Sequence, residues 1–226
     1  IEEIIVESKI VKEILKSFFI GKKIKIIVKS NNIAIKNIKI IIIFLYHIFF
    51  NIYKYCICRI SSKKRIVLPN FPLTLIDTYV TPGYYKKDRY YSGLWEKLET
   101  EEKKTTFFLP TLSYTKIRNI FSAYKELRKS ESLYILKEDY LKFSDLLYAL
   151  FIFFRIRNIR VAPIYHEGVN ISRLFNYDLK RIDSSYNNSV NAILNYRFFM
   201  RLKKMNVKIK MIIDWWENQP LDKGLH

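Results

Sequence analysis

Apolar residues recur along the chain with spacings that predict strands and helices in alternation. Near the N-terminus, the apolar run 2–7 is typical of a strand, and residues 9–19 repeat apolar side chains at helical spacing. Residues 23–28 then alternate into a second strand. A strand, a helix and a strand in succession predict a parallel pair joined by a right-handed crossover. Because the alternation continues almost to the end, we interpret residues 1–210 as one α/β domain with a mainly parallel sheet flanked by helices.

Further elements follow from the same patterns. The sequence predicts strands at residues 65–70, 73–80, 105–112, 133–136 and 207–213, and helices within residues 86–98, 114–128, 142–154 and 183–205.

The most apolar stretch, residues 38–58, is interrupted by His47, Asn51 and Lys54. This spacing places the three polar residues on one narrow face of a helix. Three environments fit such a helix: the interface of a membrane, the interior of the protein or a subunit contact, and a bilayer span. Three polar groups at mid-depth make the span costly. We expect a helix with this polar triad on one side and much of the opposite apolar face exposed.

The chain carries a net charge of +19, from 40 Lys and Arg against 21 Asp and Glu. Its basic residues are spread along the whole chain, whereas nucleic-acid binding favours a basic cluster on one element. We therefore predict no nucleic-acid partner. Basic residues surround the apolar stretch, which predicts peripheral contact with an anionic membrane; they are Lys36, Lys39, Lys54, Arg59, Lys63, Lys64 and Arg65.

Metal and cofactor chemistry has no support in the residue pattern. Cys56 and Cys58 are the only cysteines, and the three histidines are scattered, so neither a disulfide framework nor a zinc spacing is present. The five glycines form no phosphate-binding loop. We predict no metal and no resident cofactor.

The C-terminal stretch combines a strand, a polar and aromatic loop, and a helix start. The strand ends at Asp214, and Pro220 favours the first position of a helix. We expect this strand inside the sheet, because Ile212 and Ile213 need cover on both faces. Ligands of open α/β sheets bind beyond the carboxyl ends of strands, and a helix N-terminus attracts anions.

Glu217 is the first candidate for catalysis, as a general base or as a ligand of sugar hydroxyls. Its neighbours Trp215, Trp216, Asn218 and Gln219 suit binding of a sugar, by stacking and by hydrogen bonding. The structural alternative is that the tryptophans cap a core and Asn218 caps the helix.

A second group of candidates lies around a predicted strand–turn–helix junction. Asp77 and Asp88 are possible catalytic carboxylates there, and Arg89 and Tyr90 are possible substrate-binding residues. The alternative is helix capping and a local Asp–Arg pair.

Two further candidates stand apart from these groups. His166, next to Glu167, suits proton transfer, although a surface hydrogen bond is the simpler interpretation. Arg197 and Arg201 fall within the apolar stripe of the helix 183–205. Each needs an anion, a carboxylate or a path to water, and the pair could reach toward a phosphate.

Several motifs together resemble a family of bacterial surface-carbohydrate (O-antigen and lipopolysaccharide) biosynthesis proteins, in the same order from about Arg65 onward. The motifs are Ile76-Asp77-Thr78, Pro82-Gly83-Tyr84, Asp88 to Leu94, Leu136 to Tyr140, Asn195 to Phe198, Asp214 to Gln219, and Asp222-Lys223-Gly224. Trp215-Trp216 departs mildly from the family pattern, which has Trp-Phe or Trp-Tyr before Glu-Asn-Gln.

The resemblance implies glycosyl transfer from a nucleotide sugar to a glycan or lipid-linked acceptor, without a metal, by a transferase with two Rossmann-like domains (GT-B type). Residues 1–210 would form the N-terminal Rossmann-like domain, and residues 211–226 would lead into the interdomain cleft, with Lys223 among the substrate-binding residues. The chain begins at Ile1 and ends one turn into a predicted helix, so we expect it to be part of a longer protein. The implied location is the cytoplasm, at the inner face of the cytoplasmic membrane. The alternative is a non-catalytic, membrane-associated scaffold for glycan assembly.

Overall fold

The structure is a computed structural model of a mixed α/β protein with 53% helix and parallel sheets. Contacts divide the chain into two compact units: unit 1 is Ile1–Tyr46 with Phe151–Tyr186, and unit 2 is His47–Leu150 with Asn187–His226. The predicted boundary near residue 210 stays a prediction. The structure describes residues 2–6, 8–28, 33–61, 67–84, 90–91, 93–112, 115–156, 158–159, 161–179 and 186–214.

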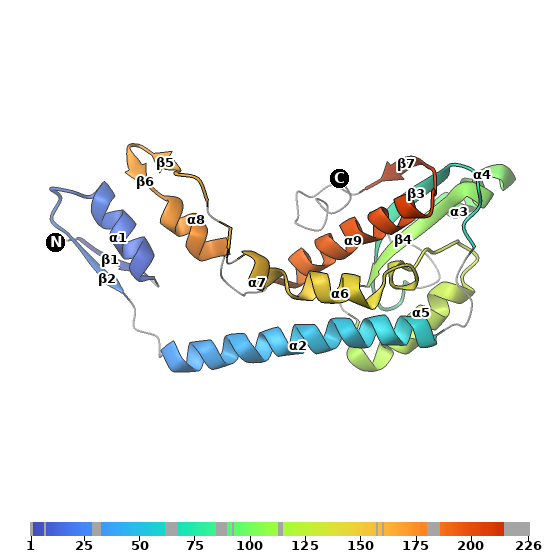
Figure 1. Cartoon of the computed structure of the whole chain (residues 1–226), viewed down its shortest axis with the longest axis horizontal. Coiled ribbons are helices and arrows are strands. Elements are labelled where there is room, and N and C mark those ends of the chain that lie inside the picture. Colours follow the sequence, from blue (N-terminus) through green and yellow to red (C-terminus); the bar gives the residue numbers. More distant parts are fainter. Residues whose placement is uncertain are drawn as a thin grey trace. The chain divides into compact units, whose positions relative to one another are not determined.

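Unit 1 begins with the β–α–β arrangement that the sequence predicts. Strands β1 (Glu2–Val6) and β2 (Ile24–Val28) pair in parallel, joined through helix α1 (Lys9–Phe18) (Figure 1). The Ser8 side chain caps α1 by accepting a hydrogen bond from the Ile10 amide at 3.2 Å. The strand–helix–strand prediction for this segment is confirmed.

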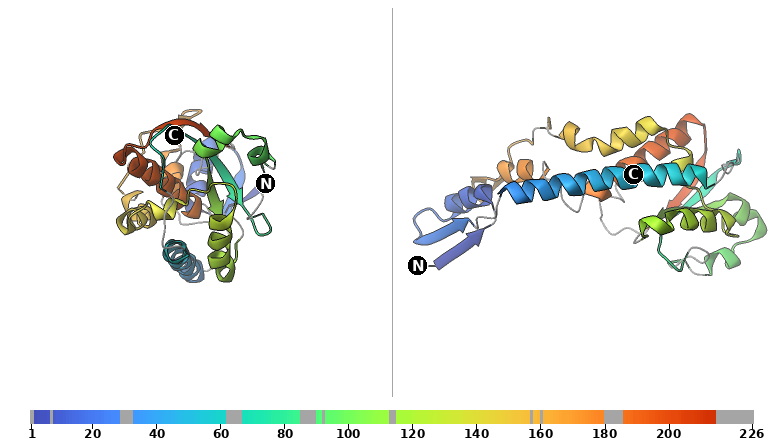
Figure 2. Two further views of the ribbon diagram at one scale, coloured as in Figure 1. Left: turned by 90° about the vertical axis from the view of Figure 1, so that its right-hand side faces the viewer. Right: turned by 90° about the horizontal axis from the view of Figure 1, so that it is seen from below.

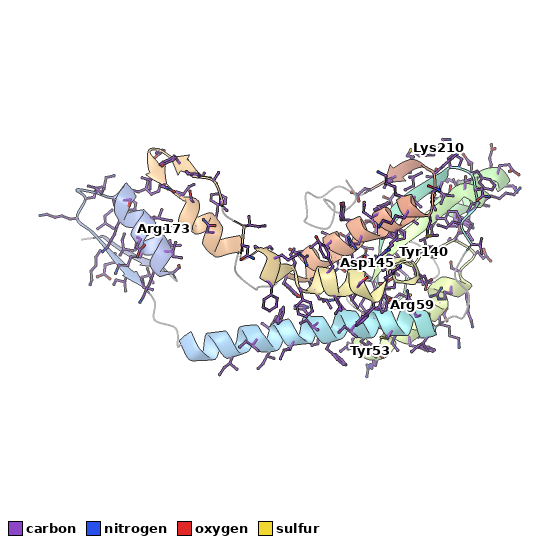
Figure 3. The ribbon with its side chains drawn as sticks, in the orientation of Figure 1. Tyr53, Arg59, Tyr140, Asp145, Arg173 and Lys210 are labelled. Atoms are coloured by element: carbon purple, nitrogen blue, oxygen red, sulfur yellow. The ribbon has the colours of Figure 1, made fainter. Side chains whose placement is uncertain are left out.

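The second part of unit 1 contains helices α7 (Ile152–Ile156) and α8 (Ser172–Leu179) and a short antiparallel hairpin between them. The hairpin joins β5 (Tyr165–His166) to β6 (Val169–Asn170), and Glu167 and Gly168 both have positive φ, as a two-residue hairpin turn requires. Arg173 of α8, labelled in Figure 3, forms an ion pair with Glu13 of α1 at 3.2 Å.

Helix α2 (Ile33–Ile60) is continuous and contains the most apolar part of the chain (Figure 2). Asn51 and Lys54 are buried, with exposed fractions of 3% and 7%, whereas Leu45 and Phe49 are 57% and 59% exposed. The expectation of a polar face on one side and an exposed apolar face on the other is confirmed. Among the described helices, residues Ile41–Ile60 form the one segment long and apolar enough to cross a membrane, by length and composition.

Unit 2 contains a three-stranded parallel sheet in the order β4-β3-β7 (Figure 1). The strands are β3 (Leu73–Val80), β4 (Thr106–Leu112) and β7 (Ile209–Ile213). The central strand is β3, in which six of eight residues are buried.

The prediction that the strand ending near Asp214 lies inside the sheet is wrong. Among the described strands β7 pairs with β3 alone, and Met211 is 48% exposed. The uninterrupted apolar part of β7 is short, Met211 to Ile213, so cover from one neighbouring strand and part of the core suffices for Ile212 and Ile213.

Two other strand predictions also need correction. Within the predicted strand 65–70, the described residues 67–70 form no strand, and Val67 is 90% exposed. Pro69 lacks the amide that a ladder requires, which explains this. Residues 133–136 make a single parallel bridge between Tyr134 and Phe108 and no longer strand.

The helices of unit 2 account for most of the remaining predicted elements. They are α3 (Leu94–Lys97), α4 (Thr100–Thr105), α5 (Ile120–Lys129), α6 (Phe143–Leu150) and α9 (Tyr186–Lys204), with single 3₁₀ turns η1 (Ile117–Asn119) and η2 (Lys137–Asp139). The predicted helix 142–154 is divided at Phe151 into α6 and α7, where the chain passes from unit 2 to unit 1.

Both faces of the central strand are buried. Ile76 and Val80 pack on one face in a core with Phe108 of β4 and Tyr124 of α5. Strand residues alternate between faces, so Leu75 and Asp77 lie on the opposite face, where they are 0% and 2% exposed. A charged residue thus sits in the carboxyl half of the most buried strand.

Candidate functional site

Charged and amide side chains are buried together in unit 2, next to the central strand. Asp77 comes from β3, Lys137 and Glu138 from the turn η2, and Asn195 from α9. Each of these side chains has an exposed fraction of 8% or less. The bridge at Tyr134 explains the placement of η2, because it brings the chain alongside β4 just before Lys137.

Lys137 is the most unusual of these groups. Its ammonium donates a hydrogen bond to Asn195 Oδ1 at 2.8 Å, and the residue is 2% exposed. Burial lowers the pKa of Lys137 to about 8, with Lys54 acting in the same direction and the carboxylates of Glu138 and Asp77 acting against it. A buried ammonium is costly unless it is compensated, and these two carboxylates supply the compensation.

Glu138 accepts a hydrogen bond from the Tyr124 hydroxyl at 3.0 Å. Burial is the largest cause of a pKa for Tyr124 well above its ordinary value, and the nearby Glu138 carboxylate adds to it. Tyr124 therefore remains a hydrogen-bond donor throughout the physiological pH range.

Asp139 forms a two-pronged ion pair with Arg128 of α5. Arg128 Nη1 and Nη2 lie 2.9 Å and 2.8 Å from the two carboxylate oxygens. Arg128 also donates to the Cys58 carbonyl oxygen at 2.8 Å and to Ser61 Oγ at 3.0 Å. The three successive residues of η2 thus form hydrogen bonds or an ion pair with side chains of α5 and α9. Arg128 also connects the turn to α2 through its hydrogen bond to the Cys58 carbonyl oxygen.

A second ionic cluster surrounds Asp145 in the first turn of α6 (Figure 3). Asp145 is fully buried, and its carboxylate accepts from Arg197 Nε at 2.8 Å and from Arg201 Nε at 2.7 Å. It also accepts from the Lys142 backbone amide at 2.9 Å. Burial alone would raise the pKa of Asp145, but the bonds from Arg201, from the Lys142 amide and from Arg197 outweigh it and lower the pKa to about 2.

The described candidates from the sequence fall in different environments. Asp77 lies in the buried cluster, and Arg197 is paired with Asp145. Tyr90 is 40% exposed, with its ring 6.3 Å from that of Tyr79. His166 belongs to unit 1, where it is exposed in the β5–β6 hairpin and its ring lies 6.1 Å from that of Phe18.

The other candidates lie outside the described residues: Asp88, Arg89, Trp215, Trp216, Glu217, Asn218, Gln219 and Lys223. Their assigned roles stay predictions. Within the described ranges, no group of three or more His, Cys, Asp or Glu side chains is arranged to hold a metal ion.

Sequence reasoning did not select Lys137, Glu138 or Asn195 as site residues. A usable signal was present, because three successive charged residues, Lys137 to Asp139, interrupt an otherwise apolar segment, residues 133–141. Charged residues in such a context are either exposed on a turn or compensated in the interior. Their burial, and the partners that allow it, come from elements far away in the sequence.

No family model, no curated protein and no solved structure matches the chain. The fold and the buried cluster define a mixed α/β protein with parallel sheets and a charged core beside its central strand.

Proposed function

We propose that the chain is part of a surface-glycan biosynthesis enzyme that transfers a glycosyl group from a nucleotide sugar to a glycan or lipid-linked acceptor. The observation that carries this proposal is that four motifs of the family resemblance, spread over residues 76–198, contribute described residues to adjoining parts of unit 2. Motifs that share a function are expected to be neighbours in the fold, whereas unrelated matches would be scattered.

The contacts between these motifs lie within unit 2. Ile76 and Leu136 belong to the same buried core, against which Leu94 and Ile213 pack. Lys137 bonds Asn195, and the ring of Tyr140 contacts that of Phe198 edge-on at a centroid distance of 5.8 Å. The pairs Lys137–Asn195 and Tyr140–Phe198 each join two motifs fifty-eight residues apart in the sequence. Ile76, Leu94 and Leu136 bring three motifs to the shared core, and Ile213 directly precedes a further motif.

In the proposed enzyme, the chain forms the N-terminal Rossmann-like half of a metal-independent GT-B transferase. The acceptor hydroxyl is deprotonated by a carboxylate, with Glu217 as the first candidate and Asp77 as the next. The turn η2 then has a positioning role, because the Lys137 ammonium balances the negative charges of Asp77 and Glu138. Asp88 and His166 remain further candidates.

The proposal is tested with the full-length protein and a panel of nucleotide sugars, by measuring release of the nucleoside phosphate. Glu217→Gln keeps the shape and removes the charge, and turnover should fall by about two to four orders of magnitude. Glu131→Gln is the matched control, because Glu131 is an exposed carboxylate in unit 2. Absence of turnover and of nucleotide-sugar binding across the panel would refute glycosyl transfer.

A second variant, Asp77→Asn, distinguishes the catalytic role of Asp77 from that of Glu217. With folding verified by circular dichroism, a loss of turnover in Glu217→Gln together with normal turnover in Asp77→Asn assigns the base to Glu217 alone. Normal turnover in both variants removes both residues from the catalytic role.

A non-catalytic scaffold is the second candidate function. It is favoured by the burial of Asp77 and Lys137, each 2% exposed, because chemistry on a substrate requires access. For a scaffold, glycan assembly in cells should continue with both Glu217→Gln and Asp77→Asn, and should stop when the protein is deleted. An enzyme predicts failure with at least one of the two variants.

A further inference from the structure

Helix α2 presents its apolar side to the outside and its polar side to the protein. Asn51 donates to Asn187 of α9 at 3.2 Å, and Lys54 lies with its ammonium 5.7 Å from the centre of the Phe50 ring. On the other side, Ile42, Leu45 and Phe49 have exposed fractions of 61%, 57% and 59%. The helix also buries Tyr55 and Cys58 in unit 2, so it has a second apolar side that stays uncovered, whereas a water-soluble amphipathic helix buries its apolar stripe.

The exposed residues form one stripe. A helix advances about 100° per residue, so positions 38, 42, 45, 49 and 56 lie within roughly 60° of one another. Asn51 and Lys54 lie roughly opposite them. The members of this apolar face are Ile38, Ile41, Ile42, Leu45, Tyr46, Phe49, Cys56 and Ile60, all exposed. A contiguous exposed apolar face of this kind marks an interaction surface.

We propose that this apolar face binds the surface of an anionic lipid bilayer, with α2 lying in the plane of the membrane interface. The inference does not depend on glycosyl transfer. An interfacial helix buries its apolar face to a depth of about 5–10 Å and is drawn to anionic headgroups by basic residues.

The positive charge of this segment favours a bilayer over a second copy of this chain as the partner of the apolar face. Residues 33–60 contain Lys36, Lys39 and Arg59 besides the buried Lys54, and no acidic residue, and Lys63, Lys64 and Arg65 follow after two serines in the sequence. Two copies joined along α2 would bring these positive charges together, and each chain carries a net charge of +19. An anionic lipid surface complements the basic composition of this part of the sequence.

The burial of the polar face of α2 favours a helix that lies in the membrane interface over a helix that crosses the bilayer. Asn51 and Lys54 are buried against unit 2, and Asn51 Nδ2 also donates to the His47 carbonyl oxygen at 2.8 Å. A span would strip α2 from α9 and place these polar groups in hydrocarbon. A helix lying in the interface keeps all of these contacts.

Cys56 offers a direct test in the unaltered chain. Cys56 is exposed on the apolar face, whereas Cys58 is buried, so a thiol-reactive, environment-sensitive fluorophore labels Cys56 selectively. Phosphatidylcholine vesicles containing phosphatidylglycerol should shift its emission to the blue, and brominated lipids should quench it at interfacial depth. Unchanged emission in the presence of these vesicles would overturn the proposal.

Charge substitutions on the apolar face complete the test. Leu45→Glu and Phe49→Glu should each weaken co-sedimentation with the anionic vesicles at least tenfold. Phe121→Glu is the matched control, because Phe121 is 42% exposed on α5 and should leave binding unchanged. Folding of all three variants is checked by circular dichroism, and their exposed positions favour retention of the fold.

The alternative occupants give different results. A concentration-dependent dimer that Phe49→Glu dissociates, without vesicle binding by the parent chain, would identify a second copy. Resistance to extraction by alkaline carbonate would identify a bilayer span. Either result overturns the interfacial assignment, as does equal binding by Phe49→Glu and the parent chain.

Discussion

The ion cluster at Asp145 predicts a large loss of stability when its carboxylate is removed. Asp145 is fully buried and joins α6 to α9 through Arg197 and Arg201, whose side chains are 31% and 17% exposed. Its carboxylate also accepts from the amide of Lys142, which precedes the first residue of α6, as the N3 carboxylate of a capping box does. Asp145→Ala removes both the ionic and the capping interactions.

The expected magnitude follows from these contacts. Removing one partner of a buried ion pair costs about 3–5 kcal/mol, and the partial exposure of both arginines places this cluster near the lower end. Loss of the hydrogen bond from the Lys142 amide adds about 1 kcal/mol. We therefore expect Asp145→Ala to lower the free energy of unfolding by about 3–4 kcal/mol. Asp145→Asn retains an acceptor for the Lys142 amide and should cost about 1 kcal/mol less.

The same cluster makes the free energy of unfolding depend on pH in the acidic range. The pKa of Asp145 is lowered to about 2 in the folded chain, below its ordinary value near 3.8. Its contribution is therefore complete above about pH 4 and is lost as the pH falls from about 4 towards 2. In both Asp145 variants this part of the acid-induced loss should disappear.

Urea unfolding followed by circular dichroism measures both effects, at neutral pH and in steps down to about pH 3. Glu131→Gln is the control for removal of an exposed carboxylate, and it should change the free energy of unfolding by at most about 0.5 kcal/mol. If Asp145→Ala resembles this control, or keeps the parent chain's full acid dependence, the ionic account of the α6–α9 contact is wrong.

Three further predictions concern buried groups of unit 2. The pKa of Lys137 is about 8 in the folded chain and about 10.4 in the unfolded chain. Between these two pH values the unfolded chain binds more protons, so the free energy of unfolding should rise with pH. Lys137→Met should lack this rise in urea titrations from about pH 7 to 10. Tyr124→Phe leaves Glu138 without a buried donor and should cost about 1–3 kcal/mol in the same titration. Burial raises the pKa of Cys58, so a thiol reagent should modify Cys56 alone in the native chain and Cys58 only after denaturation; rapid native reaction of both contradicts the burial of Cys58.

The sequence by itself determined most of the secondary structure. Apolar spacing located the strand–helix–strand start, the long helix α2, the strand 73–80 and the helix α9, because each pattern is long and regular. It also determined that α2 has one polar face, since His47, Asn51 and Lys54 recur at helical spacing. These features are local, and local periodicity suffices to find them.

Only the tertiary structure decided which strand is central and which charges are buried. The strand pattern of residues 207–213 resembles that of an interior strand, yet β7 pairs with β3 alone among the described strands, because pairing depends on distant segments. The burial of Lys137 likewise depends on Asn195, fifty-eight positions away in the sequence. The outward direction of the apolar face of α2 was expected, but it is set by contacts within unit 2 that no local pattern reveals, such as the hydrogen bond of Asn51 with Asn187 and the burial of Cys58 in the core. A sequence thus specifies which residues share a face, whereas the partners of that face are set by packing between segments far apart in the chain.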